Sequence, residues 1–246
     1  MLSRRRLLWC GGGLAAGLSL PLVPVRSRNG AEKQVQSPTL QKFVDPLPRA
    51  RSRLSPSGRL DGSPLYDVPV QSFRQQLHRD LPPTLLWGYA SQFPGPTFDV
   101  WRGQRIFVRW RSELADPGFL IPQAFDLHLH GTHRGEPMTK TVTHLHGAVV
   151  APHSDGHPDA WFTATFGEHG AEWKTQIYEY PNQQDACMLW YHDHAIGQTR
   201  LNVYAGLAGA YIIRDNEEDA LGLPSGEYEV PLIIQDRSFD ASGSLT

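Results

Sequence analysis

Short apolar runs, each closed by a proline or glycine turn, constrain the fold of this chain more than any other feature. We predict strands at 66–73, 85–89, 97–101, 106–111, 141–146, 174–180, 188–192 and 208–213. Turn signals such as Pro-Pro at 82–83 and Pro-Gly-Pro at 94–96 separate them, and the chain shows no convincing amphipathic helix. The 23 Gly and 20 Pro among 246 residues suit many short strands joined by turns. The pattern predicts an all-β fold, a Greek-key β-sandwich.

The N-terminal part of the chain departs from this pattern. Residues 1–25 carry three arginines, Arg4 to Arg6, before an apolar glycine-rich stretch, which is typical of a twin-arginine signal peptide. We therefore expect export to the periplasm or the extracellular space. No other run is long and apolar enough to predict a stable membrane span after the signal is removed. Residues 26–63, rich in Arg, Ser and Pro, predict an extended N-terminal arm.

The rest of the chain predicts one complete domain and the beginning of another. Residues 64–216 hold the eight strands and are expected to form the first β-sandwich domain. Residues 217–228 are rich in acidic and turn-forming residues and predict a linker. Residues 229–246 open with a new apolar run, which we interpret as the first strand of a second domain cut short at Thr246.

Charge and cysteine content exclude some classes of function. The net charge is −2, and no basic stretch is interleaved with aromatic residues, so we expect no nucleic-acid partner. Of the two cysteines, Cys10 lies in the predicted signal, which leaves Cys187 without a disulfide partner. Cys187 sits in an apolar run and is expected to be a small buried hydrophobic residue.

Two His-x-His pairs occupy predicted strands and suggest a metal site. In a strand, residues i and i+2 share a face about 7 Å apart, so His144 with His146, and His192 with His194, would each present two imidazoles. If the two strands are neighbours, four imidazoles converge, and imidazole is a common ligand of copper, zinc and iron. Zinc more often takes closed sets that include thiolate, so an imidazole cluster favours copper. The alternative is that backbone or solvent satisfies each histidine separately.

Longer stretches then identify a family resemblance. The segments LHRDLPPTLLWGYASQFPGPTFDVWRGQRIFVRW, EPMTKTVTHLHG, SDGHPDAWF and YPNQQDACMLWYHDHAIGQTRLNVYAGLAGAYIIRD resemble the first cupredoxin domain of bacterial multicopper oxidases. The likeness is to the branch of spore-coat laccases and bilirubin oxidases, and it extends from about Leu40 onward. It implies a cupredoxin-like fold for the predicted sandwich, followed by the first strand of a second cupredoxin domain.

The resemblance also implies a cofactor and a reaction. His144 would be a ligand of type 2 copper, and His146, His192 and His194 would be ligands of the type 3 pair. Such a trinuclear copper centre reduces dioxygen to water while a small reducing substrate is oxidised, such as a phenol, a bilirubin-like pigment or a metal ion. The full-length protein would then be a copper-dependent oxidoreductase of the laccase type.

The sequence supplies only half of what that family uses. The family completes the cluster with further His-x-His motifs in its last domain, which also carries the type 1 copper site, and these motifs are absent from the 246 residues. Cys187 is flanked by Ala186 and Met188 rather than by histidines, so it does not match the type 1 cysteine. We therefore expect an inactive fragment that lacks its C-terminal cupredoxin domains. The alternatives are a non-catalytic copper-binding or sequestering module and a copper-free structural relative, although four retained histidines argue against the latter.

A third group of histidines stays open. His128 and His130 repeat the His-x-His spacing, and His133 follows, but the loop around them is polar and glycine-rich. We interpret the three as a loop feature, or an incidental surface metal site, with ligation of the cluster as a minority alternative.

Three aspartates near the pairs are further candidates. Asp155 or Asp159 could orient a ligand histidine or relay protons, and we name Asp155 as the candidate proton relay. The equal alternative is that both cap a solvated turn. Asp193 should point away from its flanking histidines by strand alternation, as a structural residue or a surface charge.

Overall fold

Nine strands and two short helices account for most of the regular structure of the described residues. The computed structural model describes residues 37–47, 53–115, 120–121 and 137–246, within a unit that spans Val35–Thr246. The strands are β1 (Gly58–Leu60), β2 (Ser63–Gln75), β3 (Thr84–Tyr89), β4 (Gly95–Trp101), β5 (Ile106–Ser112), β6 (Thr143–His146), β7 (Ile177–Tyr180), β8 (Cys187–Asp193) and β9 (Ala208–Arg214). The helices are α1 (Thr199–Ala205) and α2 (Asn216–Ala220). The predicted signal peptide and the loop with His128, His130 and His133 lie outside the described residues.

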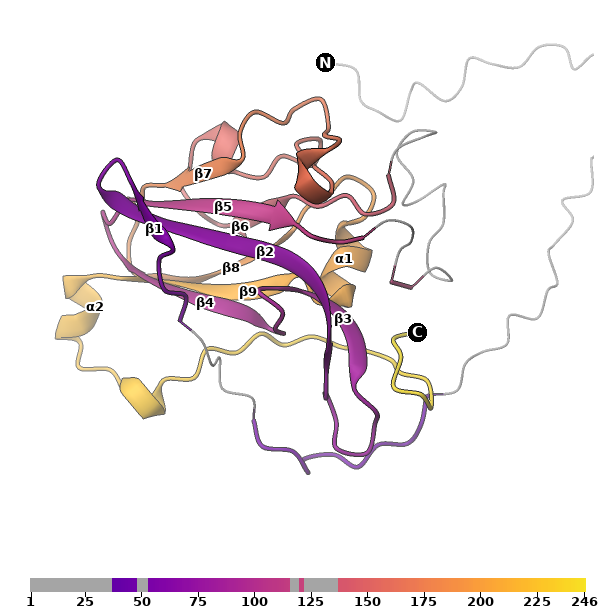
Figure 1. Ribbon diagram of the computed structural model, residues 1–246. Coiled ribbons are helices and arrows are strands. Elements are labelled where there is room, and N and C mark those ends of the chain that lie inside the picture. The colour runs from indigo at the N-terminus through magenta and orange to yellow at the C-terminus, as the bar shows by residue number, and fades with distance from the viewer. Residues whose placement is uncertain (1–36, 48–52, 116–119, 122–136) are drawn as a thin grey trace, which may run out of the picture. The chain divides into compact units, whose positions relative to one another are not determined.

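The strands form two sheets (Figure 1). The first has the order β1-β2-β5-β7, with β3 also paired to β2, and the second has the order β4-β9-β8-β6. The β2–β5 and β4–β9 pairs are parallel and the other pairs are antiparallel. Consecutive strands such as β4 and β5 belong to different sheets, so the chain crosses repeatedly between the layers. The predicted all-β sandwich is confirmed.

Aromatic side chains fill the space between the sheets. Tyr66 of β2 meets Phe98 of β4 edge to face, with ring centroids 5.3 Å apart. Trp110 of β5 packs against Tyr191 of β8 at the same centroid separation. Such pairs each add about 0.5–1.5 kcal/mol beyond the burial of their area. Because each contact joins one sheet to the other, the aromatic core fixes the position of β8 relative to the first sheet.

The eight predicted strands all overlap observed strands, but β1 was missed. It lies inside the predicted 26–63 arm and pairs antiparallel with β2. Arg53 also forms an isolated bridge with Thr97. The sheet therefore begins earlier in the chain than the predicted boundary at residue 64.

Helix α1 was not predicted either. It ends at Gly206, whose φ of +130° is a backbone conformation that glycine adopts readily and other residues rarely do. Any Cβ at this position would also lie 2.2 Å from the carbonyl oxygen of Trp87. The helix buries Leu201, Asn202 and Ala205. Seven residues make only two turns, too few for a periodic apolar face to stand out in the sequence.

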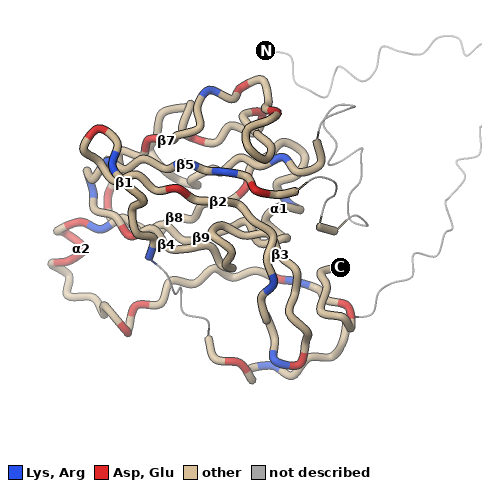
Figure 2. Tube along the Cα trace, in the orientation of Figure 1, with Lys and Arg blue, Asp and Glu red and all other residues tan. Residues whose placement is uncertain are grey.

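The predicted 217–228 linker begins with most of α2. An oxygen of the Asp215 side chain accepts a hydrogen bond from the backbone N–H of Glu218 at 2.8 Å, which is an N-cap contact. The first turn carries Glu217, Glu218 and Asp219, and Figure 2 shows these acidic residues gathered on α2. Acidic residues in a first turn are favoured by the helix dipole.

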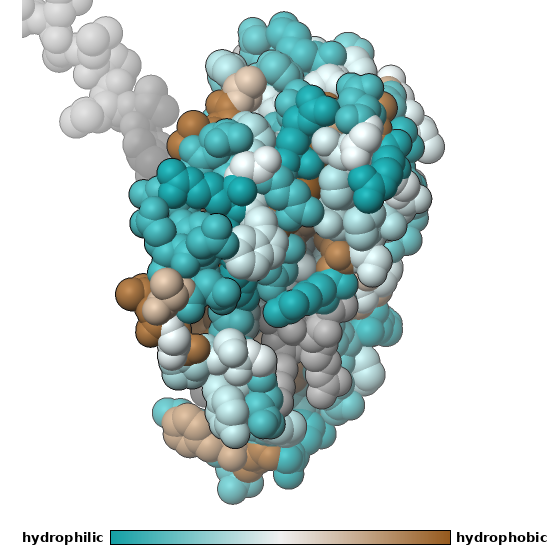
Figure 3. Space-filling view, turned by 90° about the vertical axis from the view of Figure 1, so that its left-hand side faces the viewer, coloured by the Kyte–Doolittle hydropathy of each residue, from teal (hydrophilic) through white to brown (hydrophobic). Residues whose placement is uncertain are grey.

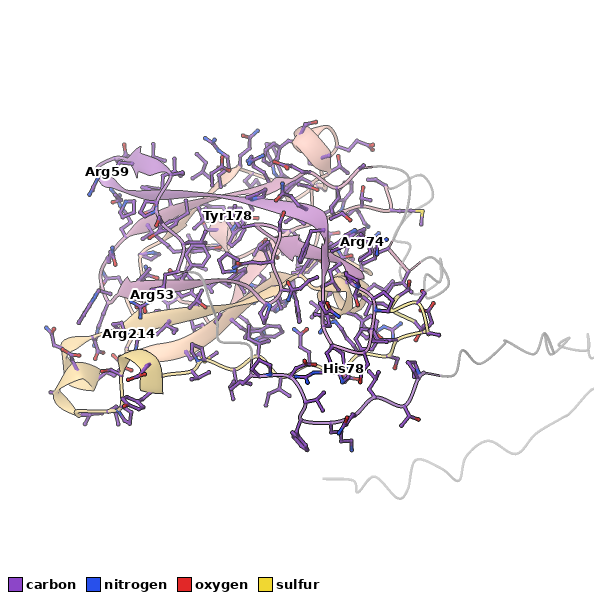
Figure 4. All side chains as sticks on the ribbon, turned by 60° about the horizontal axis from the view of Figure 1, so that its bottom comes forward. Arg53, Arg59, Arg74, His78, Tyr178 and Arg214 are labelled. Atoms are coloured by element: carbon purple, nitrogen blue, oxygen red, sulfur yellow. The ribbon has the colours of Figure 1, made fainter. Side chains whose placement is uncertain are left out.

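An ion-pair cluster holds Glu229, the residue just after this linker, to the second sheet. Arg214 of β9 donates to both carboxylate oxygens of Asp99 on β4, at 3.1 and 3.2 Å, and also to Glu229. Arg53 reaches the same Asp99 at 2.9 Å, and Figure 4 labels both arginines. Charged side chains from four separate parts of the chain therefore form one cluster at strands β4 and β9.

Residues 229–238 contain no strand, so the predicted strand of a second domain is not found there. The segment is extended, and it leaves Leu232 51% and Ile234 92% exposed. Beyond it, the Arg237 guanidinium lies 4.0 Å from the Phe93 ring centroid, and the Gly243 carbonyl accepts a hydrogen bond from Thr84 Oγ1 at 2.8 Å. The end of the chain is thus anchored to the first sheet. Figure 3 shows the side of the molecule at the left of Figure 1, which is largely hydrophilic with small separate apolar groups.

Candidate metal centre

The two His-x-His pairs lie on neighbouring strands. β6 pairs antiparallel with β8, and the register sets His144 opposite His192 and His146 opposite Trp190. Alternate residues of a strand share a face, so His144, His146 and His192 project from the same side of the second sheet. His194 directly follows β8, and its ring stacks on that of His144 with centroids 4.8 Å apart. The condition set by the sequence, that the two strands be neighbours, is met.

The four imidazole rings form one cluster. The ring centroids of His144 and His146 are 5.4 Å apart, those of His144 and His192 are 5.5 Å apart, and those of His192 and His194 are 5.7 Å apart. Within the described residues, one ligand atom from each of His144, His146 and His192 lies within 4.8 Å of the others. These three ligand atoms are close enough together to hold one metal ion.

Backbone carbonyls hold the Nδ1 atoms of three rings. Nδ1 of His144 bonds to the carbonyl of Asp155, that of His192 to the carbonyl of Asp193 at 2.7 Å, and that of His194 to the carbonyl of Gly156 at 3.1 Å. A carbonyl only accepts, so each Nδ1 is assigned the proton and each Nε2 keeps its lone pair. Metal-ligating histidines are commonly oriented in this way.

The fourth ring differs. Nδ1 of His146 lies 3.2 Å from Nε2 of His192. Because that Nε2 carries a lone pair, Nδ1 of His146 either donates a hydrogen bond to it or, when the proton of His146 is on its Nε2, points its own lone pair toward the same space, where one cation could meet both nitrogens. The indole of Trp190 stacks on His192, with centroids 4.0 Å apart, and also on His146, at 5.4 Å. Trp190 thus fixes the planes of two rings, a role that the sequence did not reveal.

Burial keeps part of the cluster neutral. His192 is 5% exposed, and burial, together with its histidine neighbours, lowers its pKa to about 4. Burial also lowers the pKa of His194. Neutral imidazole is the form that binds metal, so these two rings are in their ligand form at neutral pH.

A tight loop brings Asp155 to the cluster. Gly156 has φ +77°, and a Cβ at this position would lie 2.2 Å from the carbonyl oxygen of Thr143. The loop therefore packs directly against β6, and Oδ1 of the half-exposed Asp155 comes within 3.4 Å of Nδ1 of His144. Among the described residues, the carboxylate found this close to His144 is that of Asp155, whereas Asp159 contributes its backbone N–H and C=O to bonds with His157 and Glu172.

Comparison with known proteins gives this arrangement a family. The multicopper oxidase family model matches residues 136–218, which include both histidine pairs. A laccase of Bacillus subtilis is 50% identical over 207 residues, covering 84% of this chain and 40% of the relative. A laccase of Haloferax volcanii is 41% identical, covering 99% of this chain and 42% of the relative. The crystal structure of a laccase from Pediococcus acidilactici superposes with a TM-score of 0.65 at 26% identity, covering 85% of this chain and 39% of that one.

The chain belongs to the multicopper oxidase family. It spans about two fifths of the length of the curated relatives that it matches. The resemblance inferred from the motifs, and the cupredoxin-like fold that it implied, are both confirmed. Where the structure of this multicopper oxidase chain is described, it contains no helix long and apolar enough to cross a membrane.

The donor set of this multicopper oxidase chain suits copper. All four candidate ligands are imidazoles, and the backbone contacts of His144, His192 and His194 leave a lone pair on each Nε2, that of His192 facing Nδ1 of His146. Among the described residues, Cys187 is not part of the group of ligand atoms that the histidines form; it is half-buried, and Nε2 of Gln184 donates to its Sγ at 3.6 Å. Burial raises the pKa of the Cys187 thiol, so it is held in its unreactive form.

Asp193 is fully buried, so of its two interpretations the structural residue is confirmed and the surface charge is wrong. Strand alternation does turn it away from the histidine face, but that side is the interior of the sandwich rather than solvent. Burial raises the pKa of its carboxyl to about 7, although hydrogen bonds from Val142, Asn202 and Ala195 oppose the rise. Asn202 and Lys140 both lie in the stretches that carry the family resemblance, but the sequence did not reveal that they are buried and meet next to Asp193.

Proposed function

We propose that this chain supplies one side of a trinuclear copper centre in a laccase-like multicopper oxidase. The observation that carries the proposal is the cluster of four imidazoles from two paired segments, three of them with Nδ1 held by a backbone carbonyl. Copper bound there would supply the one-electron chemistry by which dioxygen is reduced to water.

Each histidine has a proposed place in that centre. His144 would hold the type 2 ion, and His146, His192 and His194 would hold ions of the type 3 pair. The facing nitrogens of His146 and His192, 3.2 Å apart, support assigning both to the same pair. We place the remaining ligands, and the type 1 site that receives electrons from substrate, in the part of the relatives' length that this chain does not span.

Asp155 is the proposed proton relay. Its carboxylate is half-exposed, so it can exchange protons with water, and its Oδ1 lies 3.4 Å from Nδ1 of His144. Its backbone carbonyl meanwhile accepts the hydrogen bond that orients the same ring. One residue thus holds a ligand in place and offers a carboxylate next to it.

Substrate and location are proposed more broadly. We propose that the complete enzyme takes single electrons from phenols, bilirubin-like pigments or metal ions. The arginine run at Arg4 to Arg6 supports export by the twin-arginine route to the periplasm or beyond. That route would suit a chain that folds around its metal before it crosses the membrane.

The test is copper stoichiometry of the purified chain and of a His144→Ala, His192→Ala variant. We expect the parent to retain copper through dialysis and the double variant to lose most of it, with no oxidation of a phenolic dye by either. The matched control is His153→Ala, His157→Ala, which removes two exposed histidines beside the cluster and should retain copper. Equal copper content in all three proteins would contradict the proposal. Dye oxidation by the parent would show that a partial centre is sufficient.

A further inference from the structure

One buried carboxylate contacts the chain beside both histidine pairs. Oδ2 of Asp193 accepts a hydrogen bond from the backbone N–H of Val142 at 3.0 Å, and Oδ1 accepts one from the backbone N–H of Ala195 at 3.0 Å. Val142 lies two residues before His144, and Ala195 immediately follows His194. The two oxygens therefore join the segment that enters β6 to the segment that leaves β8.

A buried amide extends this contact to α1. Nδ2 of Asn202 donates to Oδ1 of Asp193 at 2.8 Å and to the carbonyl of Lys140 at 2.9 Å. Asp193 and Asn202 are both fully buried. The amide thus ties α1 to the same two segments, and water cannot replace any of these bonds without entering the core.

The backbone of Asp193 acts on the cluster directly. Its carbonyl accepts the hydrogen bond from Nδ1 of His192 at 2.7 Å, which orients that ring. The next backbone N–H, that of His194, donates to the carbonyl of Val142 at 2.8 Å. A shift of the Asp193 peptide would therefore move the acceptor that holds one ligand and the backbone that carries another.

We propose that Asp193 is a positioning residue that sets the placement of the two histidine pairs relative to each other. Its carboxylate acts from the core side of the sheet, through Val142, Ala195 and Asn202, while the imidazoles lie on the opposite face. The inference rests on the proposed function in taking the four imidazoles as copper ligands, but the placement itself is a property of the chain without metal.

Asparagine is the informative substitution. A carboxylate accepts hydrogen bonds on both oxygens, whereas an amide of the same shape accepts on one and donates from the other. In Asp193→Asn the NH2 group would face either the N–H of Val142 or the two donors at Ala195 and Asn202. Whichever way the amide is turned, its NH2 group meets a backbone or side-chain N–H that donated to the carboxylate, so that hydrogen bond is lost and two donors face each other.

The test is nitrogen-15 NMR of the histidine side chains in the metal-free chain. In the parent, we expect protected Nδ1–H signals from His192 and His194, since both are buried or half-buried and bonded to carbonyls. In Asp193→Asn, we expect these signals to be lost through tautomer exchange. The control is Val68→Ala, which leaves a cavity in the core beneath the other sheet. Each variant is measured at the same number of degrees below its own unfolding midpoint.

A second readout is copper affinity. Substitution of outer contacts around metal-bound histidines weakens binding by roughly 10–100-fold, and we expect a loss in that range for Asp193→Asn but not for Val68→Ala. If Asp193→Asn does not fold, Asn202→Ala serves in its place, because it removes one of the three donors and should give a smaller loss of the same signals.

The outcomes separate this inference from the proposed function. Retention of both Nδ1–H signals in Asp193→Asn, or in Asn202→Ala where that variant stands in for it, would overturn the positioning role, and so would equal loss of signals in Val68→Ala. If the parent binds no copper, the proposed function fails, while the NMR comparison still decides whether Asp193 places the histidines.

Discussion

At the scale of single residues, the cluster depends on which ring nitrogens carry protons. Three carbonyl acceptors assign the proton to Nδ1 of His144, His192 and His194. The deep burial of His192 then disfavours a second proton on that ring. The metal-free chain is thereby prepared for a cation, because its most buried ligand is neutral without any metal present.

Acidification should test this state at His192. Its pKa is about 4 in the folded chain against 6.5 for an unperturbed histidine, so between these values the unfolded chain binds the extra proton and the folded chain does not. The stability that depends on neutral His192 is therefore complete above pH 6.5 and is lost as the pH falls toward 4. We expect the gap in unfolding midpoint between the parent and His192→Gln to narrow over this range. A gap that widens on acidification would contradict the lowered pKa.

At the scale of elements, the site is built by the β6–β8 pair and the loop that packs on β6. Strand alternation and the His-x-His spacing were sufficient to predict that the two histidines of each pair share a face, whereas the pairing of β6 with β8 entered only as a condition, which the structure meets. The inward contacts of Asp193 were not predictable, because they depend on α1, a helix too short to leave a periodic signal. The role of Trp190 was also missed, because an aromatic residue in a strand is indistinguishable from core until its stacking partners are known.

The loop can be tested at Gly156. Gly156→Ala would place a Cβ 2.2 Å from the carbonyl oxygen of Thr143, beside His144, so the loop must move away from β6. Gly62→Ala is the matched control, because its φ of +75° is nearly the same and nothing lies within 4 Å of a Cβ there. We expect Gly156→Ala to cost about 1–3 kcal/mol more than the control in the free energy of unfolding, measured with urea, and to weaken copper binding. Equal losses in the two variants would show that the close packing is not needed.

At the scale of the whole molecule, the described residues form one sandwich, followed by a segment, 229–238, that does not join either of its sheets. The sandwich was predictable, since turn residues and short apolar runs mark its strands. The apolar run that opens residues 229–246 was predicted as a strand, yet a strand needs a partner, and within the described residues this run has none. Local sequence reports the preference for an extended backbone but not the presence of a neighbour.

This segment should promote self-association. Leu232 and Ile234 are exposed on a segment that forms no strand pairing within the described residues, and such a segment is a template for pairing with another chain. We expect Leu232→Ser, Ile234→Ser to reduce association, measured by light scattering as concentration rises. The control is Leu221→Ser, Leu223→Ser, which removes exposed leucines outside the extended segment. An equal effect of the two pairs would mean that exposed apolar area alone drives association.

The central claim is that these four histidines hold copper, and the most direct measurement is to locate the metal. Crystals of the chain grown with copper would be examined by anomalous diffraction at the copper absorption edge. The account predicts copper peaks in the anomalous difference density within bonding distance of ring nitrogens of His144, His146, His192 and His194, on the outer face of the β6–β8 pair. Copper found only at other residues, with these rings unliganded, would contradict it.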